Sequence, residues 1–120
     1  MNILVTGASK GIGNVIAREL SKVGEVFVTG RNENALCSFG EGKYCVCDLT
    51  QSIDVLCDFI QGKQIDVLVN NAGEYIYGAI DSMQDTDIQK IYSTNLYAPT
   101  KLITASVPYM KSKKWGRIVN

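Results

Sequence analysis

The sequence predicts an open α/β fold, in which a parallel sheet carries helices on both faces within one domain spanning residues 1–120. Three observations lead to this prediction. Short β-rich runs alternate with longer stretches in which apolar residues recur every three or four positions. Strands spaced in this way are joined by right-handed crossovers, which makes them parallel. Each of the first four runs is followed by glycine or polar residues, as expected where a ligand binds at the carboxyl ends of strands.

The first strand and the first helix are predicted within the first 24 residues. Asn2–Thr6 is an apolar run that leads into glycine. Residues 11–23 follow with an apolar stripe at helical spacing, and Gly24 is expected to end the helix. The stripe consists of Ile12, Ile16, Leu20 and Val23.

The next segments extend the alternation. The runs EVFVT at residues 25–29 and KYCVC at residues 43–47 predict the second and third strands. Residues 32–39 between them are expected to form one or two helical turns. Thr50 is expected to cap a helix over residues 51–61, and Gly62 to end it. The residues of this helix that should face inward are Ile53, Leu56 and Ile60.

The last third of the chain predicts a strand, a long helical stretch and another strand. Residues 65–69 (IDVLV) predict the fourth strand. Ser82 and Asp85 match a capping box, so an interrupted helix is expected from there to about residue 111. Pro99 and Pro108 are expected to mark its breaks or kinks. Residues 116–120 (GRIVN) begin a fifth strand.

The composition excludes several classes of function. The chain has no histidine, so histidine general bases, serine–histidine triads and histidine metal sites are excluded. Twelve basic and twelve acidic residues give a formal net charge of zero, which argues against a nucleic-acid or anionic-membrane surface. No apolar run approaches the roughly eighteen residues that span a bilayer, and the N-terminus lacks the basic segment of a signal peptide. We therefore expect a cytoplasmic protein.

The four cysteines predict neither a metal site nor a disulfide framework. Cys37, Cys45, Cys47 and Cys57 form no C-x-x-C pair. We expect Cys45 and Cys47 to point to opposite faces of their strand. Reduced thiols that pack as small hydrophobic side chains are the favoured interpretation.

The segment TGASKGIG places Gly7, Gly11 and Gly13 between the first strand and the first helix. This spacing is neither G-x-G-x-x-G nor a P-loop, but the same physics applies. Glycine allows a tight turn and a close approach to a pyrophosphate, while the helix start aims free N–H groups at it. A plain strand-to-helix turn rarely needs three glycines in seven residues. The segment therefore predicts a dinucleotide-binding site.

Polar residues after the next three strands extend the predicted site. Arg31 stands where NAD enzymes usually carry an acidic residue, and with Lys10 it could hold a 2′-phosphate, which favours NADP. The alternative is a pair of solvated cations, and the nearby Glu33 leaves NAD open. Asp48 can accept a hydrogen bond from an adenine amino group or cap the following helix. The amides of NNAG at residues 70–73 can tie neighbouring loops together and contact the nucleotide.

Together these motifs resemble the short-chain dehydrogenase/reductase family, whose single-domain members contain a Rossmann-like doubly wound parallel sheet. The matching segments are TGASKGIG (6–13), DLT with Asp48, NNAG (70–73), STNL with Asn95, and GRIVN (116–120). The resemblance implies an NADPH-preferring oxidoreductase that moves a hydride between nicotinamide and a small-molecule carbonyl or alcohol. It implies no nucleic-acid or membrane partner and is compatible with a homo-oligomer.

The resemblance also implies roles for individual residues. Asn95 would be the active-site asparagine, which positions a water in a proton relay. Arg31 would meet the 2′-phosphate. The residues that would hold the phosphates and the adenosine side of the cofactor are Gly7, Ser9, Lys10, Gly11, Ile12 and Gly13. Those that would meet the adenine are Asp48 and Leu49, and those near the adenosine ribose are Asn71, Ala72 and Gly73.

The family's chemistry also needs a serine soon after the fifth strand and a Tyr-x-x-x-Lys on the next helix. Tyr97 and Lys101 have that spacing but precede the fifth strand, so no catalytic role is expected for them. We therefore expect a sheet truncated after about five strands, which carries the nucleotide half and is inactive alone. A non-catalytic nucleotide-binding module and a non-functional truncated remnant are the alternatives.

Overall fold

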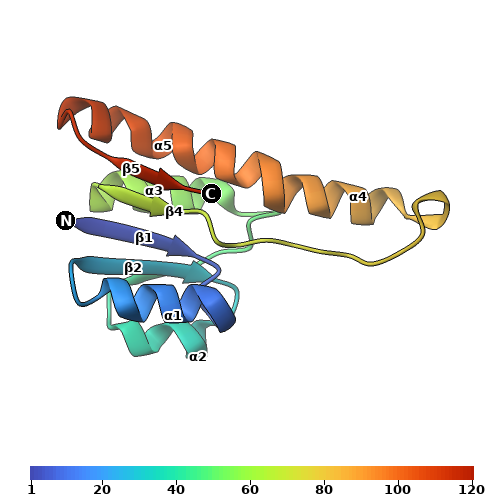
Figure 1. Cartoon of the computed structure of the whole chain (residues 1–120), viewed down its shortest axis with the longest axis horizontal. Helices are drawn as coiled ribbons and strands as arrows, with labels where there is room; N and C mark the ends of the chain where they lie inside the picture. The colour runs from blue at the N-terminus through green and yellow to red at the C-terminus, as the bar shows by residue number, and fades with distance from the viewer.

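In a computed structural model that describes residues 1–120, the chain forms a five-stranded parallel sheet in the order β3-β2-β1-β4-β5 (Figure 1). The strands are β1 Asn2–Thr6, β2 Glu25–Gly30, β3 Tyr44–Val46, β4 Val67–Val69 and β5 Arg117–Val119. The α-helices are α1 Gly11–Leu20, α2 Glu33–Leu36, α3 Ile53–Lys63, α4 Asp85–Tyr92 and α5 Ala98–Ser112. Shorter helical turns lie at Cys37–Phe39 and Ile80–Ser82, and a π-helical turn, Ser93–Tyr97, joins α4 to α5. The predicted fold class is confirmed.

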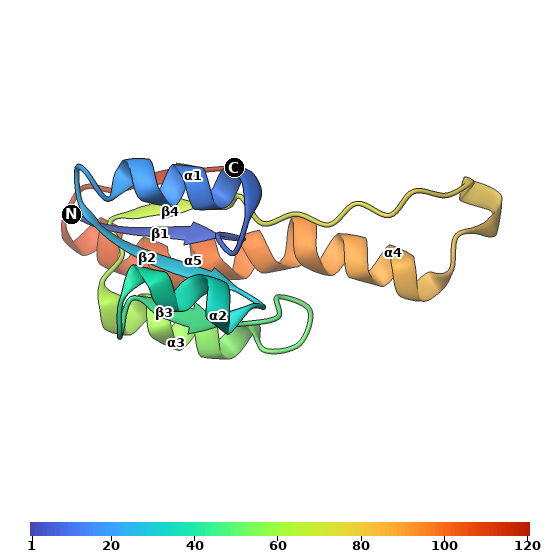
Figure 2. The ribbon, with the colours of Figure 1, turned by 90° about the horizontal axis from the view of Figure 1, so that it is seen from below.

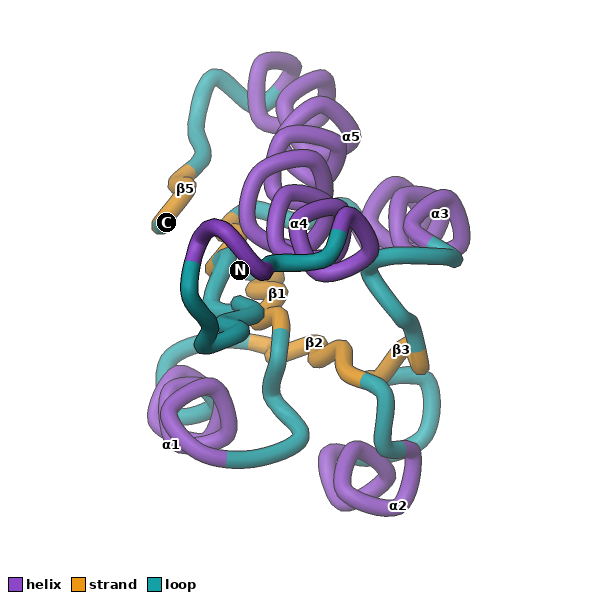
Figure 3. Tube along the Cα trace, turned by 90° about the vertical axis from the view of Figure 1, so that its right-hand side faces the viewer, coloured by secondary structure: helices purple, strands orange, loops and turns teal.

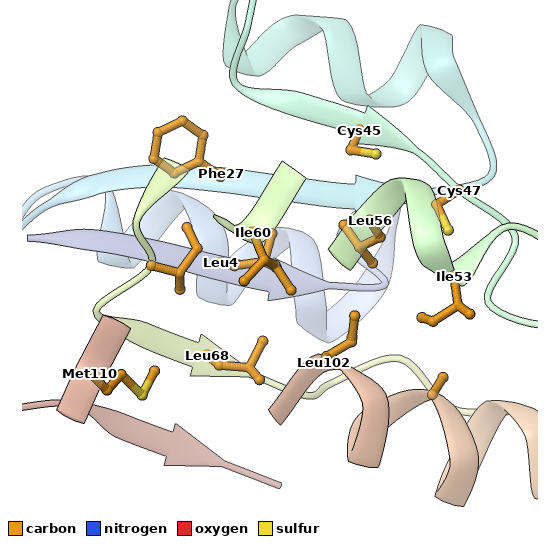
Figure 4. Packing of buried hydrophobic residues seen from close by; sticks show 12 residues of the cluster. Leu4, Phe27, Cys45, Cys47, Ile53, Leu56, Ile60, Leu68, Leu102 and Met110 are labelled. Atoms are coloured by element: carbon orange, nitrogen blue, oxygen red, sulfur yellow. The ribbon is translucent and has the colours of Figure 1, made fainter. Parts of the chain in front are cut away.

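Helices cover both faces of the sheet: α1 and α2 lie on one side, α3 and α5 on the other (Figure 3). Side chains alternate along β1, so that Leu4 packs toward α3 and α5, while Ile3 and Val5 pack toward α1 and α2. All three are fully buried. Ile53, Leu56 and Ile60 of α3 face the sheet as predicted, beside Leu102 of α5 (Figure 4). These two layers position the strand ends that form the site.

Residues 74–92, which we name the arm, project beyond the sheet. The arm comprises the extended segment after β4, the turn at Ile80–Ser82 and helix α4, and both side views show it extending away from the carboxyl ends of the strands (Figures 1 and 2). Its side chains are largely exposed, including Tyr75 (82%) and Tyr77 (90%). None of the helices combines the length and hydrophobicity needed to cross a bilayer.

The predicted stripe of α1 is confirmed at Ile16 and Leu20, which pack against the core, but not at its two ends. Ile12 and Val23 are 75% and 66% exposed, whereas Gly13 and Ala17 are the buried positions of the helix. Small side chains let α1 approach the sheet closely. Gly24 lies beyond the end of α1 at Leu20. It is required by packing, because a Cβ there would lie 2.8 Å from the Met1 carbonyl oxygen.

Three predicted helix boundaries are also wrong. Helix α3 begins after Ser52, not Thr50, and it ends at Lys63, followed by Gln64 in the left-handed conformation, so Gly62 lies inside the helix. The Thr50 hydroxyl donates instead to Asp48 Oδ1. The capping box does not form, because Ser82 Oγ donates to the Ala79 carbonyl and α4 starts after Gln84.

Of the two prolines expected to mark breaks in the long helical stretch, Pro99 lies at one and Pro108 does not. The interruption is the π-helical turn at Ser93–Tyr97. Pro99 follows directly on this turn, at the second residue of α5, and Pro108 lies inside α5 without ending it.

Cys45 and Cys47 both pack into the cluster beneath α3, so the expectation that they point to opposite faces is wrong. Residues two apart on a strand share a face. Burial, with a smaller contribution from Cys47, raises the pKa of the Cys45 thiol to about 11. This thiol therefore stays protonated at neutral pH.

Asp66, directly before β4, joins the first strand to the end of α5. Its side chain is buried, Oδ2 accepts from the Asn2 amide at 2.7 Å, and Oδ1 accepts from the Lys113 ammonium. Burial raises the pKa of Asp66, but the hydrogen bonds from Lys113 and Asn2 outweigh it and hold that pKa below the ordinary value. The resulting stabilisation is present above the unfolded-state pKa of about 3.9 and is lost as the pH falls through the lower folded-state value.

We expect Asp66→Asn to lower the free energy of unfolding at pH 7 by about 2 kcal/mol, because the amide cannot replace the charged acceptor. At a pH below the lowered folded-state pKa of Asp66 the loss should shrink, because the wild-type carboxylate is then protonated as well. Urea unfolding at both pH values measures this difference. Asp54→Asn is the control, because Asp54 is exposed and lies 3.9 Å from Lys101, so its effect should stay within about 0.5 kcal/mol. Equal losses at both pH values would contradict the expectation.

Candidate functional site

The carboxyl ends of β1, β2, β3 and β4 surround a cleft of about 590 Å³. It lies where β1 and β4, neighbours in the sheet, lead their chains to opposite faces, which is the place where ligands bind in open α/β sheets. Ten predicted site residues line it: Gly7, Ser9, Lys10, Gly11, Arg31, Asp48, Leu49, Asn71, Ala72 and Gly73. Residues from all four predicted strand ends therefore meet in one place.

The glycine-rich turn after β1 is built by close packing. Gly7 has φ +69°, and a Cβ there would lie 2.9 Å from the Cα of Ala72. A Cβ on Gly13 would lie 2.5 Å from the Gly7 carbonyl oxygen and would overlap the Asn71 side-chain amide. Gly13 does not line the cleft itself but packs behind Gly7. The two glycines thus let α1, the turn and the NNAG segment come together.

Two hydroxyl groups in the cleft have no hydrogen-bond partner. Ser9 Oγ and Thr29 Oγ1 are buried and unpaired, and both residues line the cleft. A Cβ on Gly30 would collide with Ser9 Oγ, so a glycine at the end of β2 makes room for this hydroxyl. Buried polar groups are rarely left unpaired in proteins unless something else satisfies them.

The NNAG segment is tied to the end of β1. Asn71 Nδ2 donates to the Thr6 carbonyl at 2.9 Å, and the Ala72 amide donates to Thr6 Oγ1 at 2.9 Å. Asn70 Nδ2 donates to Asn120 Oδ1 at 2.8 Å, which joins the ends of β4 and β5. These asparagine amides therefore hold the floor of the cleft together, one of the two roles that the sequence suggested.

Asp48 is held as a carboxylate at the end of β3. Its Oδ1 accepts from the Thr50 hydroxyl at 2.7 Å and from the Thr50 amide at 2.9 Å. These two bonds, the side-chain one first, lower the pKa of Asp48, and Arg31 contributes in the same direction. No group of the chain donates to Oδ2, which leaves this atom for another donor.

Arg31 and Lys10 are the two cations that line the cleft. Both are exposed, and neither takes part in any of the five ion pairs of the chain. Glu33 does not line the cleft; its carboxylate accepts from the Tyr44 hydroxyl at 3.3 Å. An anionic group in the cleft would therefore face two unpaired positive charges.

Two of the predicted site residues besides Gly13 do not line the cleft. Ile12 is exposed at the start of α1. Asn95 lies in the π-helical turn, where Nδ2 donates to the Glu74 carbonyl at 2.7 Å and Oδ1 accepts from the Glu74 amide at 2.8 Å. Glu74 lines the cleft and also lies 3.6 Å from Lys90. Asn95 thus holds the backbone of Glu74, a residue of the cleft wall, without lining the cleft itself.

Several lining residues were missed from the sequence: Thr29, Gly30, Asn32, Cys47, Thr50, Glu74 and Thr94. Most of them flank a predicted residue, so widening each strand-end motif by one or two positions would have found them. Thr94 comes from the π-helical turn, and no local pattern places it there. Tyr97 and Lys101 lie outside the cleft, as expected, and Lys101 pairs with Asp54.

Comparison with known proteins agrees with this geometry. The family model described as short chain dehydrogenase matches residues 1–120. A 3-ketodihydrosphingosine reductase of Bacteroides thetaiotaomicron is 34% identical over 98% of this chain and 45% of its own length. A 3-oxoacyl-(acyl-carrier-protein) reductase of Rickettsia prowazekii is 37% identical over 98% of this chain and 51% of its own length. The chain therefore spans about half the length of the curated relatives it matches.

Solved structures show the same arrangement. A metagenomic short-chain oxidoreductase in complex with NADP superposes with a TM-score of 0.87 at 34% identity, over 98% of this chain and 60% of that one. A 3-oxoacyl-(acyl-carrier-protein) reductase from Agrobacterium tumefaciens with NADP bound has a TM-score of 0.87 at 25% identity, over 98% of this chain and 50% of that one.

Proposed function

This chain belongs to the short chain dehydrogenase family, and from that membership we propose that it supplies the nucleotide-binding half of an NAD(P)-dependent oxidoreductase. The reaction would move a hydride between the nicotinamide and a small-molecule carbonyl or alcohol. Hydride transfer is the chemistry that the cofactor supplies when it is bound. The protein's own residues would hold and orient it.

The observation that carries this proposal is the cleft at the strand ends, lined by the glycine-rich turn and by two cations that form no ion pair. The Ser9 segment, together with free N–H groups at the start of α1, would bind the pyrophosphate. Asp48 Oδ2 would accept from the adenine amino group beside Leu49. The segment at residues 71–73 would lie along the adenosine ribose.

We further propose that NADP is the preferred cofactor. Arg31 and Lys10 form no ion pair in the chain, so both charges are available to a 2′-phosphate. Two structural relatives were solved with NADP, which supports the same choice. Asn95 would hold the Glu74 segment and, in the family's reaction, position a water for proton transfer.

Fluorescence titration of the chain with NADPH and NADH tests both proposals. We expect NADPH to bind at least about tenfold more tightly, because one charge-assisted contact is worth roughly that much. Equal affinities would overturn the NADP preference. Failure of both nucleotides to bind would favour the non-functional remnant.

A carbonyl-reduction assay separates an enzyme from a binding module. We expect the 120 residues alone to bind nucleotide without turnover, because they hold no serine after β5 and no Tyr-x-x-x-Lys there. Assembly into a homo-oligomer is a further proposal, which size-exclusion chromatography would test. A cytoplasmic location stays a prediction.

A further inference from the structure

We propose that Tyr44 is a positioning residue for cofactor selectivity, because its hydroxyl holds the Glu33 carboxylate away from the cleft. The inference rests on the proposed nucleotide-binding function. Glu33 is two residues from Arg31, close to where NAD-binding proteins of this architecture carry the carboxylate that binds the ribose 2′-hydroxyl. The position of the Glu33 carboxylate therefore affects the choice between NAD and NADP.

The orientation of Glu33 follows from the way α2 is anchored. Asn32 caps the helix, with Oδ1 accepting from the Ala35 amide at 3.2 Å, so Glu33 is the first helical residue. Leu36 is fully buried against the sheet. Residues three apart share one side of a helix, so Glu33, although exposed, lies on the same side of α2 as Leu36. There it meets Tyr44, whose hydroxyl donates to Oε1 at 3.3 Å.

Tyr44 is well placed to be this donor. It lies at the start of β3, paired with Val28, whereas the cleft lies at the carboxyl ends of the strands. Its ring packs against the cluster that contains Leu36 and Val28, which fixes the position of the hydroxyl. Partial burial first, and then the charge of Glu33, raise the pKa of Tyr44. The phenol thus stays protonated and can donate across the neutral range.

No other side chain competes for Glu33. It forms no ion pair, and Tyr44 is the one side chain that donates to its carboxylate. Lys43, the neighbouring cation, lies 3.7 Å from Glu25 instead. If the Tyr44 hydroxyl is removed, the flexible Glu33 side chain is free to turn toward Arg31. A carboxylate there repels a 2′-phosphate and can accept from a 2′-hydroxyl.

The test is a double-mutant cycle on nucleotide affinity. NADPH and NADH dissociation constants are measured for the wild type, Tyr44→Phe, Glu33→Gln and the double variant. We expect Tyr44→Phe to reduce the NADPH-over-NADH selectivity by about threefold, a size typical of a partly screened charge. In the Glu33→Gln background the same change should leave selectivity unaltered. Tyr77→Phe, on the exposed arm, is the matched control and should change nothing.

The outcomes are distinguishable. If wild-type chain binds neither nucleotide, the proposed function fails, and this inference fails with it. If wild type prefers NADPH and Tyr44→Phe preserves that preference, the inference alone is overturned. An equal loss of selectivity in both backgrounds would also overturn it, because Tyr44 would then act through packing. Phenylalanine keeps the ring, so the melting temperature should change little in either background.

Discussion

Replacing Gly13 by valine is expected to lower the free energy of unfolding by at least about 3 kcal/mol and to abolish nucleotide binding. A Cβ at this position lies 2.5 Å from the Gly7 carbonyl oxygen and overlaps the Asn71 side chain, and backbone cannot move aside as a flexible side chain can. The Asn71 amide also holds the Thr6 carbonyl, so the displacement would spread to the end of β1. Urea unfolding and NADPH titration measure the two losses.

The matched control is Gly62→Ala. Gly62 lies inside α3 with open space around its Cα, so no clash accompanies the added methyl group. Alanine should stabilise the protein by about 0.5 to 1 kcal/mol, because glycine loses more backbone entropy on entering a helix. If Gly13→Val proved no more harmful than a surface substitution, the close packing of the glycine-rich turn would be refuted.

Arg31→Glu should weaken NADPH binding by about a hundredfold, because it removes charge-assisted hydrogen bonds and adds a like charge. NADH lacks the 2′-phosphate, so its affinity should change by less than about fivefold. The difference between the NADPH and NADH effects of the substitution should also shrink at 1 M salt, where the screening length falls to about 3 Å. Titrations of both nucleotides at two salt concentrations measure all three effects.

Lys111→Glu provides the control for net charge. Lys111 lies in the last turn of α5 and does not line the cleft, yet the substitution changes the charge of the chain by the same amount. It should leave NADPH affinity nearly unaltered. Equal losses for the two variants would mean that Arg31 acts through the overall field and not through contact.

Strand positions and the cleft could be predicted because both depend on local sequence. β1 is a continuous apolar run, and its glycine-rich continuation is recognisable wherever it occurs. The parallel arrangement then brings Arg31, Asp48 and Asn71 together without further information. Helix ends were less predictable, since Gln64 takes the left-handed conformation in place of the neighbouring Gly62.

Contacts between distant segments could not be predicted. Asn95 bonds with Glu74, 21 residues away in the chain, and nothing near either residue indicates that pairing. The same holds for Tyr44 and Glu33, which meet because α2 packs on the sheet beside β3. The buried stripe of α1 was misjudged for a related reason: close helix–sheet packing selected Gly13 and Ala17 over the larger Ile12.

The two Asn95 bonds to Glu74 close the arm at its base, and Lys90 adds a third link to the same residue. A segment whose two ends are joined in this way tolerates changes in length, because the entropy cost of closing a loop grows only slowly with loop length. The segment between Glu74 and Lys90 can be lengthened, shortened or exchanged without moving Gly73 and Glu74 in the cleft wall. The nucleotide site should therefore stay constant when the length or sequence of the arm changes.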